Sequence, residues 1–211
     1  MSSAANITLV DAAINRRTIY QLTKTSPVPD SRLLELVRHA ARHVPSGFDS
    51  QTTRMVVLLS AEHDRFWDFV WDALQPHLKS EDQSKASRAR IDGFRGAHGT
   101  ILFFESQNAQ DATAKKFPTY ADKIGQFGEH SNAMHQYLLW TAFEAEGLGC
   151  NLQHYNPLVD ERVIEHYGLD KDLVLKAQLV FGGLPEGKSI GDLARPKELK
   201  HREEYVKVFG A

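Results

Sequence analysis

The sequence predicts one domain in which helices alternate with short strands, as they do in α+β and α/β folds. A long helix is predicted within residues 129–157, and most of its circumference is apolar or aromatic. Short runs rich in β-branched residues lie on both sides of it and are separated by helical patterns. A chain of 211 residues is long enough to bury a substantial core.

The first half of the chain predicts helices joined by two strands. Thr8 or Asp11 lies near the start of the first helix. Asp30 is predicted to cap the second helix, and Pro45 ends it. The predicted elements, in order, are helix 7–15, helix 30–44, strand 55–60, helix 66–74, a charged helical segment 79–95 and strand 99–105.

The central helix is the element around which we expect the domain to be organised. Ser131 is predicted to cap it, and Gly147 and Gly149 end it because glycine tolerates the left-handed conformation found there. A helix that is apolar nearly all round must be buried on several sides. We therefore expect it in the middle of the domain or at a subunit interface. Its apolar residues are Met134, Tyr137, Leu138, Leu139, Trp140, Ala142, Phe143 and Ala145.

The remaining segments complete the predicted order. Residues 106–128 are polar with scattered aromatic residues, and we expect an excursion from the core there. The basic tail 195–211 ends in a YVKVF run that could add a strand to a sheet edge. The elements predicted after the central helix are strand 149–153, helix 159–167, strand 174–181 and a turn at 182–189.

Composition narrows the class of protein. The 25 basic and 27 acidic residues nearly cancel, so we expect neither a nucleic-acid nor a membrane partner. The single cysteine, Cys150, excludes an internal disulfide framework and fits a reducing compartment. Residues 1–17 lack the pattern of a secretory signal, and no apolar run is long enough to cross a bilayer. We expect a cytoplasmic protein, with the nucleus also open.

Three polar stretches are candidates for binding. The first is Arg16, Arg17 and Thr18, which could hold a phosphate but could equally form a solvated basic turn. The second is the loop 45–54, where ligands bind in many folds but where turn-forming residues are also ordinary. For each of these alone, the ordinary interpretation is favoured. The third, residues 151–156, places five polar side chains directly after a buried helix, which favours a hydrogen-bonding site over satisfied polar packing.

Motifs for other chemistry are lacking in the sequence. No spacing typical of a metal site, a nucleophile elbow, a P-loop or a dinucleotide fingerprint occurs, so no metal is expected. Cys150 follows the glycine stop and is expected to be inert packing.

Together and in order, these stretches resemble the nitroreductase family of flavin mononucleotide (FMN) enzymes. The resemblance covers nearly the whole chain and is strongest with the fungal-type branch, which is linked to fatty-acid-dependent regulation. The LQHYNP and AQLVFG segments are specific to that branch. The segments that carry the resemblance are 16–22, 44–54, 99–105, 130–157, 175–185 and 204–210.

The resemblance implies the architecture of the protein. It implies a single α+β domain over residues 1–211, with a mainly antiparallel sheet flanked by helices in a sandwich. It also implies an obligate homodimer that holds FMN between its subunits. The apolar helix at 131–147 would then lie at the dimer interface, in agreement with its hydrophobicity on all sides.

The resemblance also assigns roles to individual residues. Residues 16–18 would hold the FMN phosphate and one ring edge, and the 45–51 loop would reach a flavin from the facing subunit or at the ring edge. The backbone at Leu152 and Gln153 would approach the reactive flavin nitrogen N5. The implied cofactor-binding residues are Arg16, Arg17, Thr18, Pro45, Ser46, Asp49, Gln51, Leu152, Gln153, Gly182, Gly183, Lys188 and Arg202. The aromatic residues expected to bind the acceptor are Phe48, Phe117, Tyr120, Phe127 and Tyr155.

Asp49 departs from the family pattern, which usually has asparagine there. A carboxylate accepts hydrogen bonds but cannot donate them, and it repels the anionic edge of a reduced flavin. We expect this residue to lower the flavin potential or weaken binding.

The implied activity is that of an FMN-dependent NAD(P)H oxidoreductase. NADH or NADPH would deliver a hydride, and a nitroaromatic, quinone or similar planar acceptor would receive it in a ping-pong cycle. The flavin carries this chemistry, so no catalytic side chain is required. The alternative is a non-enzymatic flavin-binding redox sensor or regulatory partner in lipid metabolism.

Overall fold

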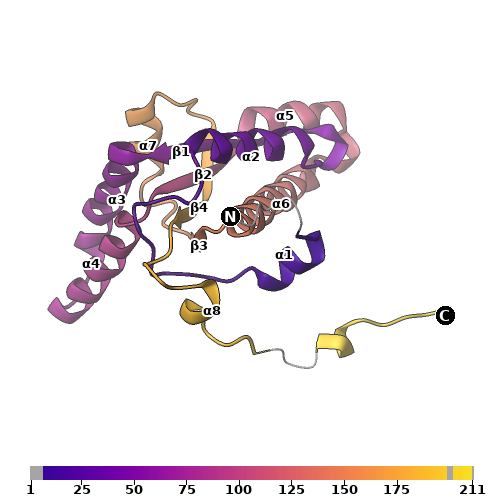
Figure 1. The fold of residues 1–211 in the computed structure, drawn as a ribbon. Helices are drawn as coiled ribbons and strands as arrows, with labels where there is room; N and C mark the ends of the chain where they lie inside the picture. The colour runs from indigo at the N-terminus through magenta and orange to yellow at the C-terminus, as the bar shows by residue number, and fades with distance from the viewer. Residues whose placement is uncertain (1–6, 199–201, 211) are drawn as a thin grey trace.

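The computed structural model describes residues 7–198 and 202–210, with the side chains of residues 202 and 203 left out. Its core is a four-stranded sheet in the order β1-β2-β4-β3, and all neighbouring strands are antiparallel (Figure 1). The strands are β1 (Thr53–Leu59), β2 (Gly99–Ser106), β3 (Gly149–Gln153) and β4 (Leu173–Gly182). The predicted α+β class with an antiparallel sheet is confirmed.

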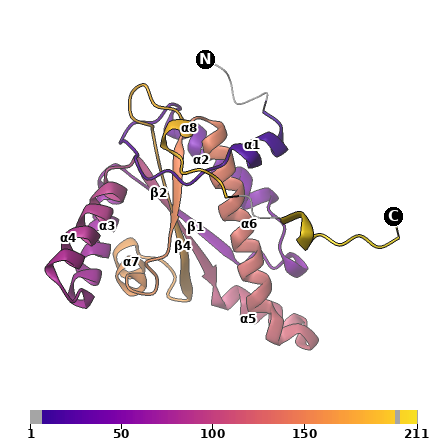
Figure 2. The ribbon, with the colours of Figure 1, turned by 90° about the horizontal axis from the view of Figure 1, so that it is seen from below.

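Helices cover both faces of the sheet. α3, α4 and α7 lie on one face, and α2 and α6 lie on the other, as Figures 1 and 2 both show. The helices of the described residues are α1 (Leu9–Asn15), α2 (Asp30–His43), α3 (Ser60–Leu74), α4 (Glu81–Arg95), α5 (Gln107–Lys116), α6 (Ile124–Ala145), α7 (Asp160–Tyr167) and α8 (Ile190–Leu193). Short 3₁₀ turns occupy η2 (Gly47–Asp49), η3 (Gln75–His77), η4 (Pro118–Lys123) and η5 (Arg202–Tyr205).

Strand β2 is buried along its whole length, because both of its faces are covered. Its side chains alternate between the two cores. Leu102 and Phe104 join the cluster under α3, α4 and α7, whereas Ile101 and Phe103 join the cluster under α2 and α6. This explains why the sequence of β2 is a continuous apolar run.

Several predicted boundaries and caps are wrong. Asp30 is the first residue of α2 and makes no cap; its Oδ1 lies 2.7 Å from Nε2 of His98. Ser131 lies inside α6, which starts at Ile124, and its hydroxyl donates to the carbonyl of Pro45. Ser60 starts α3 rather than ending β1. Gly149 does not end α6, whose last residue is Ala145, but it does start β3, as the predicted strand 149–153 requires.

Gly147, in contrast, has the left-handed φ of 91° that was predicted for the helix stop.

The remaining segments complete the comparison with the predictions. The segment 106–128, for which we expected an excursion from the core, folds as α5, η4 and the first turn of α6, and this does not contradict that expectation. Residues 206–210 of the tail form no strand, and α8 was not predicted at all. Within the described ranges, no helix is both long and apolar enough to cross a membrane.

A buried carboxylate joins β2 to three neighbouring elements. Glu105 is 1% exposed and accepts hydrogen bonds from Thr53 of β1, Asn132 of α6 and Gln110 of α5. Gly128 of α6 faces this cluster, and a Cβ atom there would lie 2.5 Å from Oε2 of Glu105. The absence of a side chain at Gly128 therefore makes room for the carboxylate.

We expect Gly128→Ala to reduce the free energy of unfolding by about 1–3 kcal/mol, because the added methyl overpacks this site. Gly125→Ala, one turn earlier in the same helix, is the control. Its Cβ would meet only Oε1 of Gln110, at 3.6 Å, so it should stabilise the protein by up to about 1 kcal/mol through helix propensity. Equal effects in urea denaturation would contradict this steric account.

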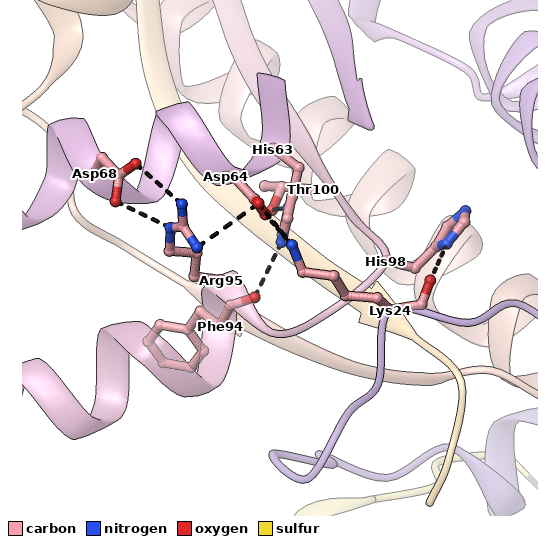
Figure 3. A network of polar contacts seen from close by, with 8 residues as sticks. All are labelled: Lys24, His63, Asp64, Asp68, Phe94, Arg95, His98 and Thr100. Carbon is pink, nitrogen blue, oxygen red and sulfur yellow. Dashed lines mark hydrogen bonds and ion pairs between the residues drawn. The ribbon is translucent and has the colours of Figure 1, made fainter. Parts of the chain in front are cut away.

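A second buried network centres on His63 (Figure 3). Nε2 lies 3.1 Å from the carbonyl of Phe94 and so carries the proton, while Nδ1 accepts from the hydroxyl of Thr100 at 2.9 Å. Trp67 donates to the same hydroxyl. A second proton on the ring, at Nδ1, would make His63 a donor to the Thr100 hydroxyl, as Trp67 already is. The hydroxyl proton of Thr100 would then lose its acceptor. Burial lowers the pKa of His63 to about 4.

Because the folded pKa of His63 lies below the ordinary value of 6.5, the unfolded chain binds the proton more readily. The free energy of unfolding should therefore fall by up to roughly 3 kcal/mol as the pH drops from 6.5 to 4. Denaturation of His63→Gln across this range should show a shallower slope than wild type. The exposed His77→Gln is the control and should keep the wild-type slope.

Candidate active site

The segment after α1 runs beside the edge strand of the sheet. Thr18 forms a parallel bridge to Cys150 of β3, and the amide of Ile19 donates to the Cys150 carbonyl at 2.8 Å. The buried Asn151 side chain donates to the carbonyl of Ile19. These bonds fix the backbone of residues 16–19 next to the C-terminal half of α6.

Arg16 lies against α6. Its guanidinium is 4.3 Å from the centre of the Trp140 ring, in a cation–π contact. Its Nη1 is buried and has no hydrogen-bond partner among the described residues. A buried guanidinium nitrogen without an acceptor is costly, so an acceptor from outside the described residues would stabilise this atom.

Glu144, near the C-terminal end of α6, contacts the same turn. Its carboxylate accepts from the backbone N–H of Arg17 at 2.7 Å and from the indole of Trp140 at 2.8 Å. The indole also donates to the carbonyl of Arg17. Burial raises the pKa of Glu144 to about 7, and the two hydrogen bonds and the charges of Arg16 and Arg17 oppose that rise.

Two adjoining hollows extend from this turn, with volumes of about 490 Å³ and 580 Å³. They share Tyr20, Gln21 and Arg195 as lining residues. We call them together the basic groove, because five cationic side chains line them and none of the described lining residues carries a carboxylate. The cationic residues are Arg16, Arg17, Arg90, Arg195 and Lys197.

The polar run 151–156 divides between the fold and the groove. Gln153 lines the groove, and its side chain donates to Asn151. Asn156 accepts from Gln178, whose carbonyl in turn accepts the backbone N–H of Tyr155. Many of the polar groups in this run therefore have hydrogen-bond partners within the fold. Leu152, one residue before Gln153, is partly buried in the core under α6.

The loop before β1 adopts an unusual backbone. Phe48, Asp49 and Gln51 have positive φ values of 57°, 53° and 47°, which residues other than glycine rarely adopt. The hydroxyl of Ser46 accepts from the Gln51 amide, and the Gln51 side chain donates to Asp49. Ser46 and Gln51 also line a hollow of about 220 Å³, together with Thr53, Arg54, Ser131 and His135.

Four of the five predicted aromatic residues come together around Phe48. Its ring stacks on Phe117 with 4.4 Å between centroids, and lies 5.2 Å from Tyr120 and 6.1 Å from Phe127. We call these four residues the aromatic wall.

Tyr155 is not part of the aromatic wall. It packs against Trp67 and Phe94 in the core on the other face of the sheet.

Other predicted residues lie apart from the groove. Gly182 and Gly183 face the segment 23–25, where an added Cβ would come within 2.5 Å of Thr23 and 2.3 Å of Thr25. Close backbone approach therefore accounts for both glycines. Lys188 is exposed in the following turn. Arg202 starts η5, but its side chain lies outside the described part of the chain.

Sequence reasoning missed several residues of this region. Trp140 was identified only as an apolar helix residue, although its indole joins Glu144 to the basic turn. Arg90 and Arg195 have no local motif. An acidic residue within an apolar helix was the available signal for Glu144, because such a residue is costly unless it has partners.

The basic groove and the aromatic wall lie at opposite ends of α6. The wall and its loop contact the N-terminal half, through Phe127 and Ser131, while Arg17 contacts Glu144. Ser131 and Glu144 are 13 positions apart, which is roughly 20 Å along a helix. Between them α6 exposes Met134, Tyr137 and Leu138 at 41%, 47% and 37%.

Comparison with known proteins gives concordant matches. The model of the Nitroreductase family matches residues 13–183. The chain is 31% identical over 185 residues to nitroreductase FRM2 of Saccharomyces cerevisiae, covering 85% of this chain and 91% of that protein.

Solved structures agree with these matches. Nitroreductase CinD of Lactococcus lactis, in complex with nicotinic acid, has a TM-score of 0.85 at 34% identity over 96% of this chain and all of that chain. Other CinD structures hold chloramphenicol or 4-nitrophenol. The FMN-dependent nitroreductase NfnB of Mycobacterium smegmatis, in complex with NADPH, shares the fold at 15% identity, with a TM-score of 0.70 over 96% of this chain and all of that chain.

Proposed function

The chain belongs to the nitroreductase family, and from that premise we propose that it is an FMN-dependent oxidoreductase. It takes reducing equivalents from NADH or NADPH and passes them to a nitroaromatic, a quinone or a similar planar acceptor. The observation that carries the proposal is the basic groove, with its buried and unpartnered Arg16 nitrogen.

The residues of the groove suit FMN. A phosphate needs several donors and positive charge, and residues 16–18, Arg195 and Lys197 offer both at one end. A flat heterocycle needs polar edges and a stacking surface, which Tyr20, Gln21 and Gln153 offer at the other end. When bound, FMN supplies hydride transfer. The chain's own residues bind and orient it and neutralise its phosphate.

The proposal includes a homodimer in which each site draws on both subunits. The aromatic wall and the basic groove lie too far apart in one chain to form one site. An antiparallel pairing of two α6 helices would bring the wall of one subunit to the groove of the other. The exposed apolar side chains of α6 support this arrangement. Exposed apolar side chains elsewhere also support it. They are Leu9, Val10 and Ile14 of α1 and Val208 and Phe209 of the extended tail (Figure 1).

In this arrangement the aromatic wall stacks on the acceptor. Nicotinic acid and 4-nitrophenol, two of the three compounds named above in CinD structures, are flat aromatic molecules of the kind that such a wall accommodates. Water is excluded by the two subunits together, because neither subunit encloses the site alone.

We expect the purified protein to be yellow, to release FMN on denaturation, and to lose its flavin colour under anaerobic NADH or NADPH. Arg16→Ala should weaken FMN binding by about tenfold or more, because the phosphate loses a buried cationic partner. Arg88→Ala, which removes a surface arginine paired with Asp92 on α4, is the matched control and should bind normally. A colourless protein that binds no added FMN would refute the proposal.

Asp49→Asn is expected to raise the reduction potential of the bound flavin or tighten its binding. The substitution removes a negative charge and leaves an oxygen that can still accept from Gln51. Potentiometric titration with a reference dye measures the first effect and fluorescence titration the second. If neither quantity changes, Asp49 does not face the cofactor.

A further inference from the structure

Glu144 is buried at the C-terminal end of α6, 7% exposed, and it contacts residues 16–18, which we call the anion-binding turn, through two routes. One carboxylate oxygen accepts the backbone N–H of Arg17, and the other accepts the indole N–H of Trp140. The indole ring then carries the guanidinium of Arg16 on its face. The carboxylate therefore fixes both the backbone of the turn and the direction of its first cationic side chain.

From this geometry we propose that Glu144 is the positioning residue of the anion-binding turn, and that it takes up a proton when the cofactor phosphate binds there. This inference rests on the proposed function, since it concerns the same site. Its physical basis is that a phosphate near Arg16 brings a second negative charge close to a buried carboxylate. In a region of low dielectric constant, the repulsion is relieved when Glu144 gains a proton from solvent.

Among the charged and titratable groups that face Glu144, we assign the proton uptake near neutral pH to Glu144 itself. Arg16 and Arg17 face it from the N-terminal segment, and their positive charges lower the pKa of Glu144. Cys150 of β3 stays a thiol, because burial holds its pKa well above the ordinary value. Lys197 lines the same hollow as Glu144, beside α1 and α8, and bonds the carbonyl of Ile14. Burial already raises the pKa of Glu144 to about 7, so a bound phosphate acts on a carboxylate that is close to titrating.

The test is the pH dependence of flavin affinity in wild type and Glu144→Gln, measured by fluorescence titration between pH 6 and pH 8. Wild-type FMN affinity should decrease with rising pH relative to the variant, by roughly tenfold over this range. The phosphate's own ionisation, with a pKa of about 6, affects both proteins equally. Riboflavin, which lacks the phosphate, should show no such difference between the two proteins.

Calorimetry in two buffers of different ionisation enthalpy gives an independent readout. Wild type should take up protons on binding FMN at pH 7.5, and Glu144→Gln should take up fewer. Equal proton uptake, or parallel pH profiles for the two proteins, would overturn the inference while leaving the proposed function intact. Failure of wild type to bind FMN at all would instead overturn the proposed function.

A second variant tests the positioning role without altering the carboxyl group. Trp140→Phe keeps an aromatic face for Arg16 but removes the N–H that holds Glu144 and the Arg17 carbonyl. FMN affinity should fall several-fold at every pH. Trp71→Phe is the matched control, because its ring also carries an arginine, Arg88, but on the surface. Unchanged FMN affinity in Trp140→Phe would refute the positioning role.

Discussion

The arrangement of the whole molecule depends on the two different sides of α6. One side, with Leu139 and Phe143, closes the core over the sheet, whereas Met134, Tyr137 and Leu138 remain exposed. A helix of 22 residues is roughly 33 Å long and rigid, so it sets the distance between whatever is attached to its ends. The aromatic wall is attached at one end and the basic groove at the other. In the proposed homodimer, each chain carries two half-sites, and a second subunit completes each of them.

Two buried glutamates, Glu105 and Glu144, differ in role although both are buried. Glu105 is satisfied by neutral donors from three elements and ties β1, β2, α5 and α6 together. Glu144 is held by one donor from the turn, the backbone N–H of Arg17, and by one from its own helix, the indole of Trp140. It also borders a hollow lined by Arg17 and Lys197. The first arrangement joins elements of the fold and is structural. The second lies next to the turn that carries Arg16 and Arg17, and in our proposal a change in its charge alters the site.

The fold was largely predictable because its signals are local. The strands follow from apolar runs, and the stop at Gly147 follows from the backbone freedom of glycine. The start of α6 was missed because Gly125 and Gly128 resemble breaks, although Gly128 is retained to make room for Glu105. The key contacts of the site could not be predicted in this way. Glu144 meets Arg17 across 127 positions of sequence, and no periodic pattern encodes that pairing. Tyr155 was grouped with the wall because it is aromatic, and only packing assigns it to the opposite core.

The strained loop before β1 gives independent support for a shaped binding surface. Three residues other than glycine hold positive φ values there, each at a cost of about 1–3 kcal/mol. The contacts that maintain this conformation are the Ser46–Gln51 and Gln51–Asp49 hydrogen bonds and the stack of Phe48 on Phe117. Phe48 remains 40% exposed, so burial of its ring does not offset that cost. Strain that persists on a surface, and that holds an aromatic ring in one orientation, is expected where a surface is organised before its ligand arrives. The loop thus supports a ligand-binding surface near the N-terminal end of α6, as the unpartnered nitrogen of Arg16 does near the C-terminal end.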